Sequence, residues 1–204
     1  MRLNPHIKKS KNKTDKKAKK IIAITGMPGA GKTETRKIME KRGIPVVVMR
    51  HVVENEMRKK NIALTNKNLR EYADGLRKKY GYDIVAKKCV PFIKQKLKNS
   101  DIVLIDGIRG PQEVELFKKR FENNFILLSI LAKPETRFKR LKKRGREWDM
   151  KTWEEFLWRD KKELSWGLGD VIKRANYTID NEGTKKDLKK NVDKLFSKLL
   201  SSTT

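Results

Sequence analysis

The stretch Lys20-Ile-Ile-Ala-Ile-Thr-Gly-Met-Pro-Gly-Ala-Gly-Lys-Thr33 decides the fold of this 204-residue chain. Its first six residues are an apolar run rich in β-branched side chains, which predicts a buried strand over Lys20–Thr25. The next eight residues fit the pattern G-x-x-x-x-G-K-[ST] at every defined position. A helical pattern follows from Lys32 to Arg42, and Gly43 ends it. This order predicts a P-loop, because glycine allows consecutive backbone N–H groups to converge on one anion.

The predicted ligand of this loop is ATP with Mg²⁺. The backbone N–H groups and the positive end of the following helix would hold the phosphates. Lys32 would reach the β- and γ-phosphates, and the Thr33 hydroxyl would coordinate Mg²⁺. The residues expected to bind the nucleotide are Gly26, Met27, Pro28, Gly29, Ala30, Gly31, Lys32, Thr33 and Glu34.

Short apolar runs alternate with helical patterns along the rest of the chain. Further strands are expected at Pro45–Met49, Ile102–Asp106, Phe125–Leu131 and Asn176–Asp180. Further helices are expected at Val52–Lys60, Asn66–Tyr80, Asp83–Lys98 with an interruption near Pro91, Pro111–Phe121, Pro134–Arg144 and Thr184–Leu200. Unbroken apolar strands are typical of a sheet that helices cover on both faces. The alternation therefore predicts an α/β protein with a doubly wound, parallel, five-stranded sheet.

Sequence motifs and length narrow the class of P-loop protein. The Asn-Lys-x-Asp motif of a GTPase occurs only at Asn12–Asp15, before the P-loop instead of on a late strand. Too few residues follow Asp106 for the larger motor and AAA-type cores. The small kinases are the class that remains.

A second candidate site lies at Asp106-Gly107-Ile108-Arg109, where the third strand ends. A carboxylate at this strand end would lie beside the P-loop and hold Mg²⁺ or a water bound to it. Arg109 would extend over the carboxyl edge of the sheet and grip a phosphate. The alternative is that Asp106 only caps the following turn and that Arg109 is solvated.

Arginines at 137, 140 and 144 fall on neighbouring rows of the helix expected at Pro134–Arg144. Beside a polyphosphate they would neutralise charge that develops during transfer, whereas the alternative is an exposed basic helix. The predicted catalytic set is Lys32, Asp106, Arg109, Arg140 and Arg144, and the predicted metal ligands are Thr33 and Asp106.

The polar segment after this helix carries an aromatic pattern. Trp153, Phe156 and Leu157 predict one apolar stripe of a lid helix, from which Arg159 would reach ATP. The alternative is that the aromatic and basic residues of this segment stack the bases of RNA.

The net charge of +27 favours anionic partners but does not identify them. Residues 1–19 are expected to form a disordered basic tail, and residues 1–20 are a candidate for electrostatic contact with RNA. The apolar runs are too short to span a bilayer, so no membrane partner is expected. A single cysteine, Cys89, is expected to be a partly buried, reduced thiol in a cytoplasmic protein.

The chain resembles the nucleotide-kinase branch of P-loop proteins, and within it an archaeal family related to adenylate kinase and dephospho-CoA kinase. The resemblance rests on Gly26–Thr33, on Asp106 to Arg109, on residues 134–146 and on the turn at residues 180–184. It implies a kinase-like domain over 20–200, strand order 2-3-1-4-5, acceptor-binding helices over 50–99 and a lid over 145–169. It also implies that the turn at residues 180–184 packs near adenine.

The chain departs from that family after the second strand. Where the family has Gly-Asp and then an arginine that grips the acceptor phosphate, this sequence has Arg50-His51 and Glu54. Arg50 or Arg77 is a candidate substitute, and His51 is expected to be a turn residue.

The leading hypothesis is a kinase that moves the γ-phosphoryl group of ATP to an anionic, nucleotide-like acceptor, of the nucleoside monophosphate or dephospho-CoA class. One alternative is an ATP-dependent RNA-binding or ribosome-assembly factor, which the basic tail and the Trp-Arg segment support. The other is a regulatory ATPase, which the altered residues Arg50 and His51 support.

Overall fold

The computed structural model describes residues 19–146 and 149–201. Five parallel strands form one sheet in the order β2-β3-β1-β4-β5. The strands are β1 (Lys20–Thr25), β2 (Val46–Val48), β3 (Ile102–Asp106), β4 (Phe125–Leu131) and β5 (Tyr177–Asp180). The predicted α/β class, parallel sheet and strand order 2-3-1-4-5 are confirmed.

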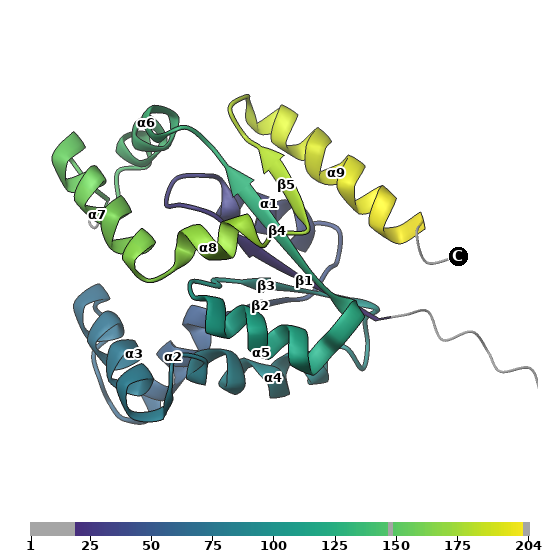
Figure 1. Cartoon of the computed structure of the whole chain (residues 1–204), viewed down its shortest axis with the longest axis horizontal. Coiled ribbons are helices and arrows are strands. Elements are labelled where there is room, and N and C mark those ends of the chain that lie inside the picture. Colours follow the sequence, from purple (N-terminus) through teal and green to yellow (C-terminus); the bar gives the residue numbers. More distant parts are fainter. Residues whose placement is uncertain (1–18, 147–148, 202–204) are drawn as a thin grey trace, which may run out of the picture.

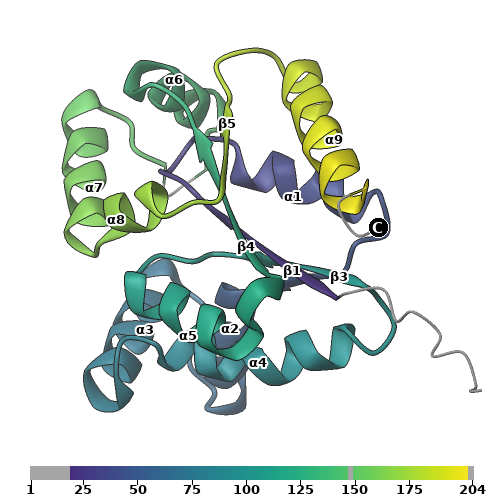
Figure 2. The same cartoon turned by 45° about the vertical axis from the view of Figure 1, so that its right-hand side comes forward.

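Helices cover both faces of this sheet (Figures 1 and 2). They are α1 (Lys32–Glu40), α2 (Met49–Lys59), α3 (Asn66–Tyr80), α4 (Ile84–Lys96), α5 (Pro111–Phe121), α6 (Pro134–Arg144), α7 (Trp153–Ser165), α8 (Leu168–Lys173) and α9 (Lys185–Ser201). A short 3-10 turn, η1 (Glu122–Asn124), precedes β4. None of the described helices is long and apolar enough to cross a membrane.

Alternate residues of each central strand enter two separate cores. In β1, Ile21 and Ala23 face the core beneath α2, α4 and α5, while Ile22 and Ile24 face the core beneath α1 and α9. This two-sided burial explains why the strands are continuous apolar runs in the sequence. It also confirms the doubly wound arrangement.

Helix α4 is continuous through Pro91, so the predicted interruption is wrong. Proline removes one helical hydrogen bond and crowds the preceding turn. The helix nevertheless buries Val85, Cys89 and Ile93 in the core, and this packing outweighs the local cost. Cys89 is fully buried instead of partly buried, and burial raises the pKa of its thiol to about 12, with a smaller contribution from Glu113.

The segment after α6 contains two helices, α7 and α8, which pack against different parts of the protein. Phe138 of α6 packs against Trp153 and Phe156 of α7, with ring centroids 5.3 and 5.5 Å apart. Leu157 is exposed, so the predicted three-residue stripe is wrong at that position. Helix α8, which the sequence pattern did not predict as a separate helix, buries Leu168 and Val171 in the same core as α5.

The arrangement brings three loops and one helix to the carboxyl edge of the sheet. The loops after β1, β3 and β4 lead into α1, α5 and α6, and α7 lies over the same edge opposite α3 (Figure 1). Open α/β sheets bind ligands at this edge. The residues predicted for the site are therefore found on neighbouring loops. The predicted tail lies outside the described residues over 1–18, as do residues 147–148 of the predicted lid.

Candidate functional site

The loop between β1 and α1 wraps tightly because three of its glycines have left-handed backbone angles. The φ values are +141° at Gly26, +83° at Gly29 and +116° at Gly31. A Cβ atom on Gly26 would overlap the carbonyl oxygen of Ile130, and one on Gly29 would lie 2.7 Å from the carbonyl oxygen of Arg137. The loop is therefore pressed against β4 and α6, and only glycine fits at these positions.

We expect Gly26→Ala to destabilise the protein much more than Gly43→Ala. Both glycines have positive φ values, so both variants carry a conformational cost of about 1–2 kcal/mol. Only Gly26→Ala adds a clash with backbone, because nothing lies within 4 Å of a Cβ atom at Gly43. Urea unfolding of the two variants measures the difference, and equal losses of stability would contradict the packing described here.

The side chain of Lys32 turns back onto its own loop. Its Nζ donates hydrogen bonds to the carbonyl oxygens of Gly26 and Met27, at 2.5 and 3.0 Å. Burial lowers the pKa of Lys32 to about 8, and Asp106 opposes this shift only in part. Two carbonyl dipoles thus hold a cation in a desolvated place, where a phosphate would provide a stronger counter-charge.

Asp106 ends β3 beside this lysine, and burial raises the pKa of its carboxyl group despite Lys32 and Arg36. Arg36 lies on α1 with its Nε atom 3.7 Å from an Asp106 oxygen. Sequence reasoning missed Arg36, although its spacing of four from Lys32 places both on one face of the helix. Thr33 occupies the first turn of α1, directly after Lys32.

Arg109 is held at both ends. Its backbone N–H donates to Glu113 at 2.8 Å, and its Nη1 atom donates to both oxygens of Glu163 at 3.0 and 3.2 Å. Glu163 is a buried residue of α7 that also accepts from Arg159 at 2.6 Å. Sequence reasoning did not find Glu113, which accepts from backbone N–H groups. It also did not find Glu163, whose bond to Arg109 joins residues 54 positions apart.

The three arginines of α6 have separate partners. Arg137 is buried, pairs with Asp160 of α7 and donates to the carbonyl oxygen of Pro28. Arg144 pairs with Asp149 at 2.8 Å, and Arg140 donates to the carbonyl oxygen of Gly183 at 3.1 Å. The helix therefore does not bring three guanidinium groups to one point. Arg140 Nη1 is buried and has no hydrogen-bond partner among the described residues.

Other predicted positions lie around this centre. Glu34 forms ion pairs with Lys37 and Lys185 at 3.7 and 3.6 Å. Asn181, in the turn that the resemblance placed near adenine, donates to the carbonyl oxygen of Ala30 at 2.7 Å. This contact fixes the turn at residues 180–184 against the P-loop.

The residues considered for the acceptor side have acidic neighbours. Arg50 pairs with Glu54 at 2.6 Å on α2. The two residues that depart from the family pattern after the second strand therefore neutralise each other. His51 is exposed on α2 instead of forming a turn. Arg77 of α3 contacts Asp74 at 3.2 Å and Glu113 at 3.8 Å.

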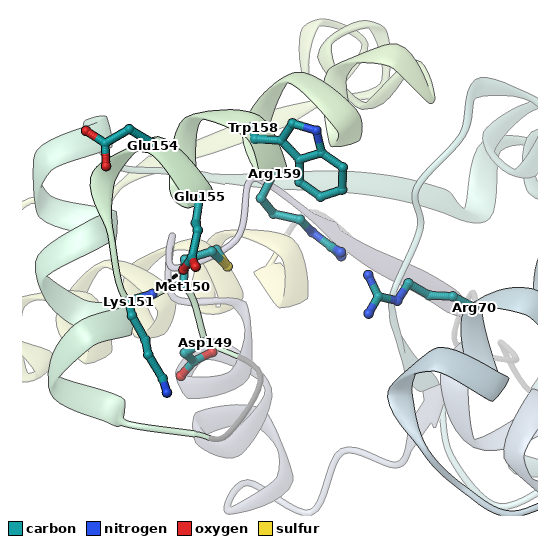
Figure 3. Close-up of a pocket in the computed structure, with 8 residues that line it drawn as sticks. All are labelled: Arg70, Asp149, Met150, Lys151, Glu154, Glu155, Trp158 and Arg159. Atoms are coloured by element: carbon teal, nitrogen blue, oxygen red, sulfur yellow. Dashed lines mark hydrogen bonds between the residues drawn. The ribbon is translucent and has the colours of Figure 1, made fainter.

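A cleft of about 600 Å³ separates α3 from the segment that leads into α7. Arg70 of α3 and Arg159 of α7 point toward each other from opposite walls (Figure 3). The remaining lining residues are Asp149, Met150, Lys151, Glu154, Glu155 and Trp158. Two facing guanidinium groups favour an anion between them. The whole lining carries three basic and three acidic side chains, so the two arginines offer one local place for an anion, beside the aromatic wall of Trp158.

Residues 22–162 match a family model described as an AAA domain. The UPF0200 protein PH1008 of Pyrococcus horikoshii is 41% identical over 183 residues, which cover 89% of this chain and 98% of the relative. The chain belongs to the UPF0200 family. A longer relative in Archaeoglobus fulgidus, the UPF0200/UPF0201 protein, is also 41% identical, and this UPF0200 chain spans about half of its length, 56%.

Solved structures show the fold of this UPF0200 chain. TT1252 from Thermus thermophilus superposes with a TM-score of 0.64 at 20% identity, over 92% of this chain and all of that one. Shikimate kinase from Acinetobacter baumannii, solved with shikimate, gives 0.55 at 18% identity, over 89% and 95% of the two chains. The UPF0200 chain therefore has a P-loop fold of the small-kinase type. The family model carries the AAA name, but the region that it matches, residues 22–162, is short. The match is therefore not to one of the larger AAA-type cores that the length of the chain argues against.

Proposed function

We propose that this protein is a kinase that transfers the γ-phosphoryl group of MgATP to an anionic, nucleotide-like acceptor. The observation that carries the proposal is that a phosphate-binding loop and a cleft lie at the same edge of the sheet. A glycine-rich loop with a desolvated lysine lies on one side, and a cleft between two helical arms opens on the other. Phosphoryl transfer needs positioning and electrostatic stabilisation more than a protein nucleophile, and this edge supplies both.

The proposed roles follow from the positions of the side chains. Backbone N–H groups of residues 26–34, all except Pro28, bind the ATP phosphates, and Lys32 exchanges its two carbonyl partners for phosphate oxygens. Arg109 binds the transferred group from the other side, since its guanidinium group is half-exposed at the same edge. Arg140 has one buried nitrogen with no hydrogen-bond partner in the described ranges, and a phosphate or a base would satisfy it. Arg144 is directed to Asp149, so its part is to hold the segment before α7.

Thr33 and Asp106 are the proposed protein ligands of Mg²⁺. The described residues contain no cluster of three or more His, Cys, Asp or Glu that would form an all-protein metal site. Mg²⁺ in phosphoryl-transfer sites takes one or two protein oxygens and completes its shell with water and phosphate, so this sparse donor set fits. The ion would supply counter-charge to the phosphates. Its charge would also keep Asp106 ionised, opposing the raised pKa that burial gives this carboxyl group.

The cleft between α3 and α7 is the proposed acceptor site. Arg70 and Arg159 would bind a phosphate or another anionic group, and Trp158, beside them, offers a face for a base. Arg50 is paired with Glu54, so we assign acceptor binding to Arg70, Arg159 and Trp158 and not to the residues after β2. The solved kinase that holds shikimate has the same fold, so small hydroxy acids belong in the test as competing acceptors.

A coupled assay of ADP formation tests the proposal directly. Purified full-length protein is supplied with MgATP and a panel of nucleoside monophosphates, dephospho-CoA and shikimate. We expect one nucleotide-like acceptor of the panel to raise ADP formation well above hydrolysis alone. Mass spectrometry should then find an equal amount of the product that has gained a phosphoryl group. If no acceptor raises turnover above that background, the kinase proposal is wrong and a regulatory ATPase replaces it.

We expect Arg70→Ala to raise the KM for that acceptor by about 10- to 100-fold, because a charged hydrogen bond in the cleft is lost. The KM for MgATP is expected to stay unchanged, since Arg70 belongs to α3 and not to the P-loop or to the loops after β3 and β4. Steady-state kinetics with each substrate varied in turn measures both values. Equal effects on both substrates would place Arg70 outside the acceptor site.

A further inference from the structure

Glu163 is a buried carboxylate at the point where α7 meets the sheet edge. Its side chain is 3% exposed, and it accepts hydrogen bonds from Arg109 and Arg159. Arg109 belongs to the loop after β3, whereas Arg159 lies one helical turn before Glu163 on α7. One carboxylate thus joins a residue of the core to a residue of the lid helix.

The charge of Glu163 is stabilised where it lies. Burial would raise the pKa of this carboxyl group, but Arg109 and Arg159, with a smaller effect of Lys32, hold it below its usual value. Glu163 is therefore ionised at neutral pH. The effect of Lys32 also places the carboxylate within electrostatic range of the P-loop.

The contacts leave donors available on both arginines. Arg109 uses only Nη1 in its contact with Glu163, and its side chain is 46% exposed. Its Nη2 and Nε atoms make no hydrogen bond to any residue in the described part of the chain, so they can donate to a ligand. Arg159 is held by Nη2 and by packing on the ring of Trp166, at 5.7 Å. A guanidinium group gripped on one side presents its other edge in a fixed direction.

We propose that Glu163 is a positioning residue that sets the direction of Arg109 and Arg159 when the lid lies over the P-loop. This inference rests on the proposed kinase function. Arg109 would then bind the phosphoryl group during its transfer only while α7 is in place, because the carboxylate that orients Arg109, Glu163, belongs to that helix. Transfer would be coupled to lid position through one buried ion pair.

A different role would give effects of the opposite sign. If Glu163 occupied the place of a phosphate, its removal would free two arginines and tighten the binding of MgATP. If Glu163 positions the arginines, its removal leaves MgATP affinity nearly unchanged and weakens the complex that resembles the transition state. The two roles are therefore distinguished by comparing the affinity for MgATP with the affinity for an analogue of the transition state.

The test uses Glu163→Gln in the full-length protein, with MgATP and with MgADP plus aluminium fluoride as the probes. We expect affinity for the aluminium fluoride complex to fall about 10- to 100-fold while MgATP affinity changes less than about threefold. Glu163→Asp, which keeps the charge, should recover part of the loss. Glu115→Gln removes one partner of an exposed Arg–Glu pair that joins α5 to the residue after α8, and it is the matched control, with no expected change.

A double-mutant cycle with Arg109→Ala decides whether Glu163 acts through Arg109. We expect the double variant to bind the aluminium fluoride complex about as weakly as Arg109→Ala alone. Additive losses, tighter MgATP binding in Glu163→Gln, or an unchanged preference for the analogue would overturn the inference. The binding measurement needs no acceptor, so it tests the role of Glu163 even if no acceptor in the panel is phosphorylated. Failure of the kinase proposal is recognised separately, from the acceptor panel.

Discussion

Replacing Lys32 by methionine is expected to weaken MgATP binding by about 100-fold while leaving the ligand-free protein at least as stable as before. The loss of affinity follows from removing a charged hydrogen-bond donor to the phosphates. The unchanged or higher stability follows from the burial that lowers the pKa of Lys32 to about 8. At pH 7 the lysine is charged in the folded and unfolded chains, so the desolvation cost is fully present in the folded state.

The sign of this effect can be checked with pH. Between about pH 8 and the usual lysine pKa of 10.5 the folded wild type has lost the Lys32 proton and the unfolded chain still carries it, so stability due to this group rises with pH. Isothermal titration with MgATP and thermal unfolding at pH 7 and pH 9 measure both parts. Lys41→Met, at the exposed end of α1, is the control. Wild-type MgATP affinity in Lys32→Met would contradict the phosphate site itself.

Asp160→Ala is expected to destabilise the protein by about 3–5 kcal/mol, because it leaves the buried guanidinium group of Arg137 without its counter-ion. For a chain of this size that loss lowers the melting temperature by about 10 °C. Arg137 also donates to Ala132 and Pro28 through their carbonyl oxygens, so the pair joins α7 to the underside of the P-loop. Differential scanning calorimetry measures the change.

Two further variants separate burial from mere pairing. Glu115→Ala breaks an exposed Arg–Glu pair and is expected to cost less than about 1 kcal/mol. Replacing both partners, as Arg137→Met with Asp160→Leu, removes the uncompensated charge and is expected to recover much of the lost stability. If the double replacement is as unstable as Asp160→Ala, the polar contacts of Arg137 to the backbone matter more than its charge.

Local sequence patterns were sufficient for the central strands and for the P-loop, whereas the strand order came from the family resemblance. Strands β1, β3 and β4 were predicted at their observed bounds, because each is a continuous apolar run with a clear end. The phosphate loop was predicted from eight consecutive residues, since glycines, lysine and threonine act there through local backbone geometry. The proline inside α4 misled the prediction, because tertiary packing decided that helix.

The side-chain pairs around the loop could not be read from sequence. Glu163 meets Arg109 across 54 positions of the chain, and Arg137 meets Asp160 across 23. In a chain with 52 basic residues, spacing on one helix says which arginines share a face but not which carboxylate neutralises them. The three arginines of α6 therefore looked like one cluster and are held by separate partners. The catalytic roles assigned to Arg140 and Arg144 stay predictions, and for Arg144 the pair with Asp149 favours the structural part proposed above.

The burial of Cys89 has a practical consequence. A thiol with a pKa of about 12, wholly enclosed by core side chains, does not compete for alkylating reagents at neutral pH. A cysteine introduced at the exposed positions Leu157 and Tyr82 would then be the reactive sulfur in each case. Fluorophores or spin labels can thus be attached one site at a time to the native framework, without first engineering out its own sulfhydryl.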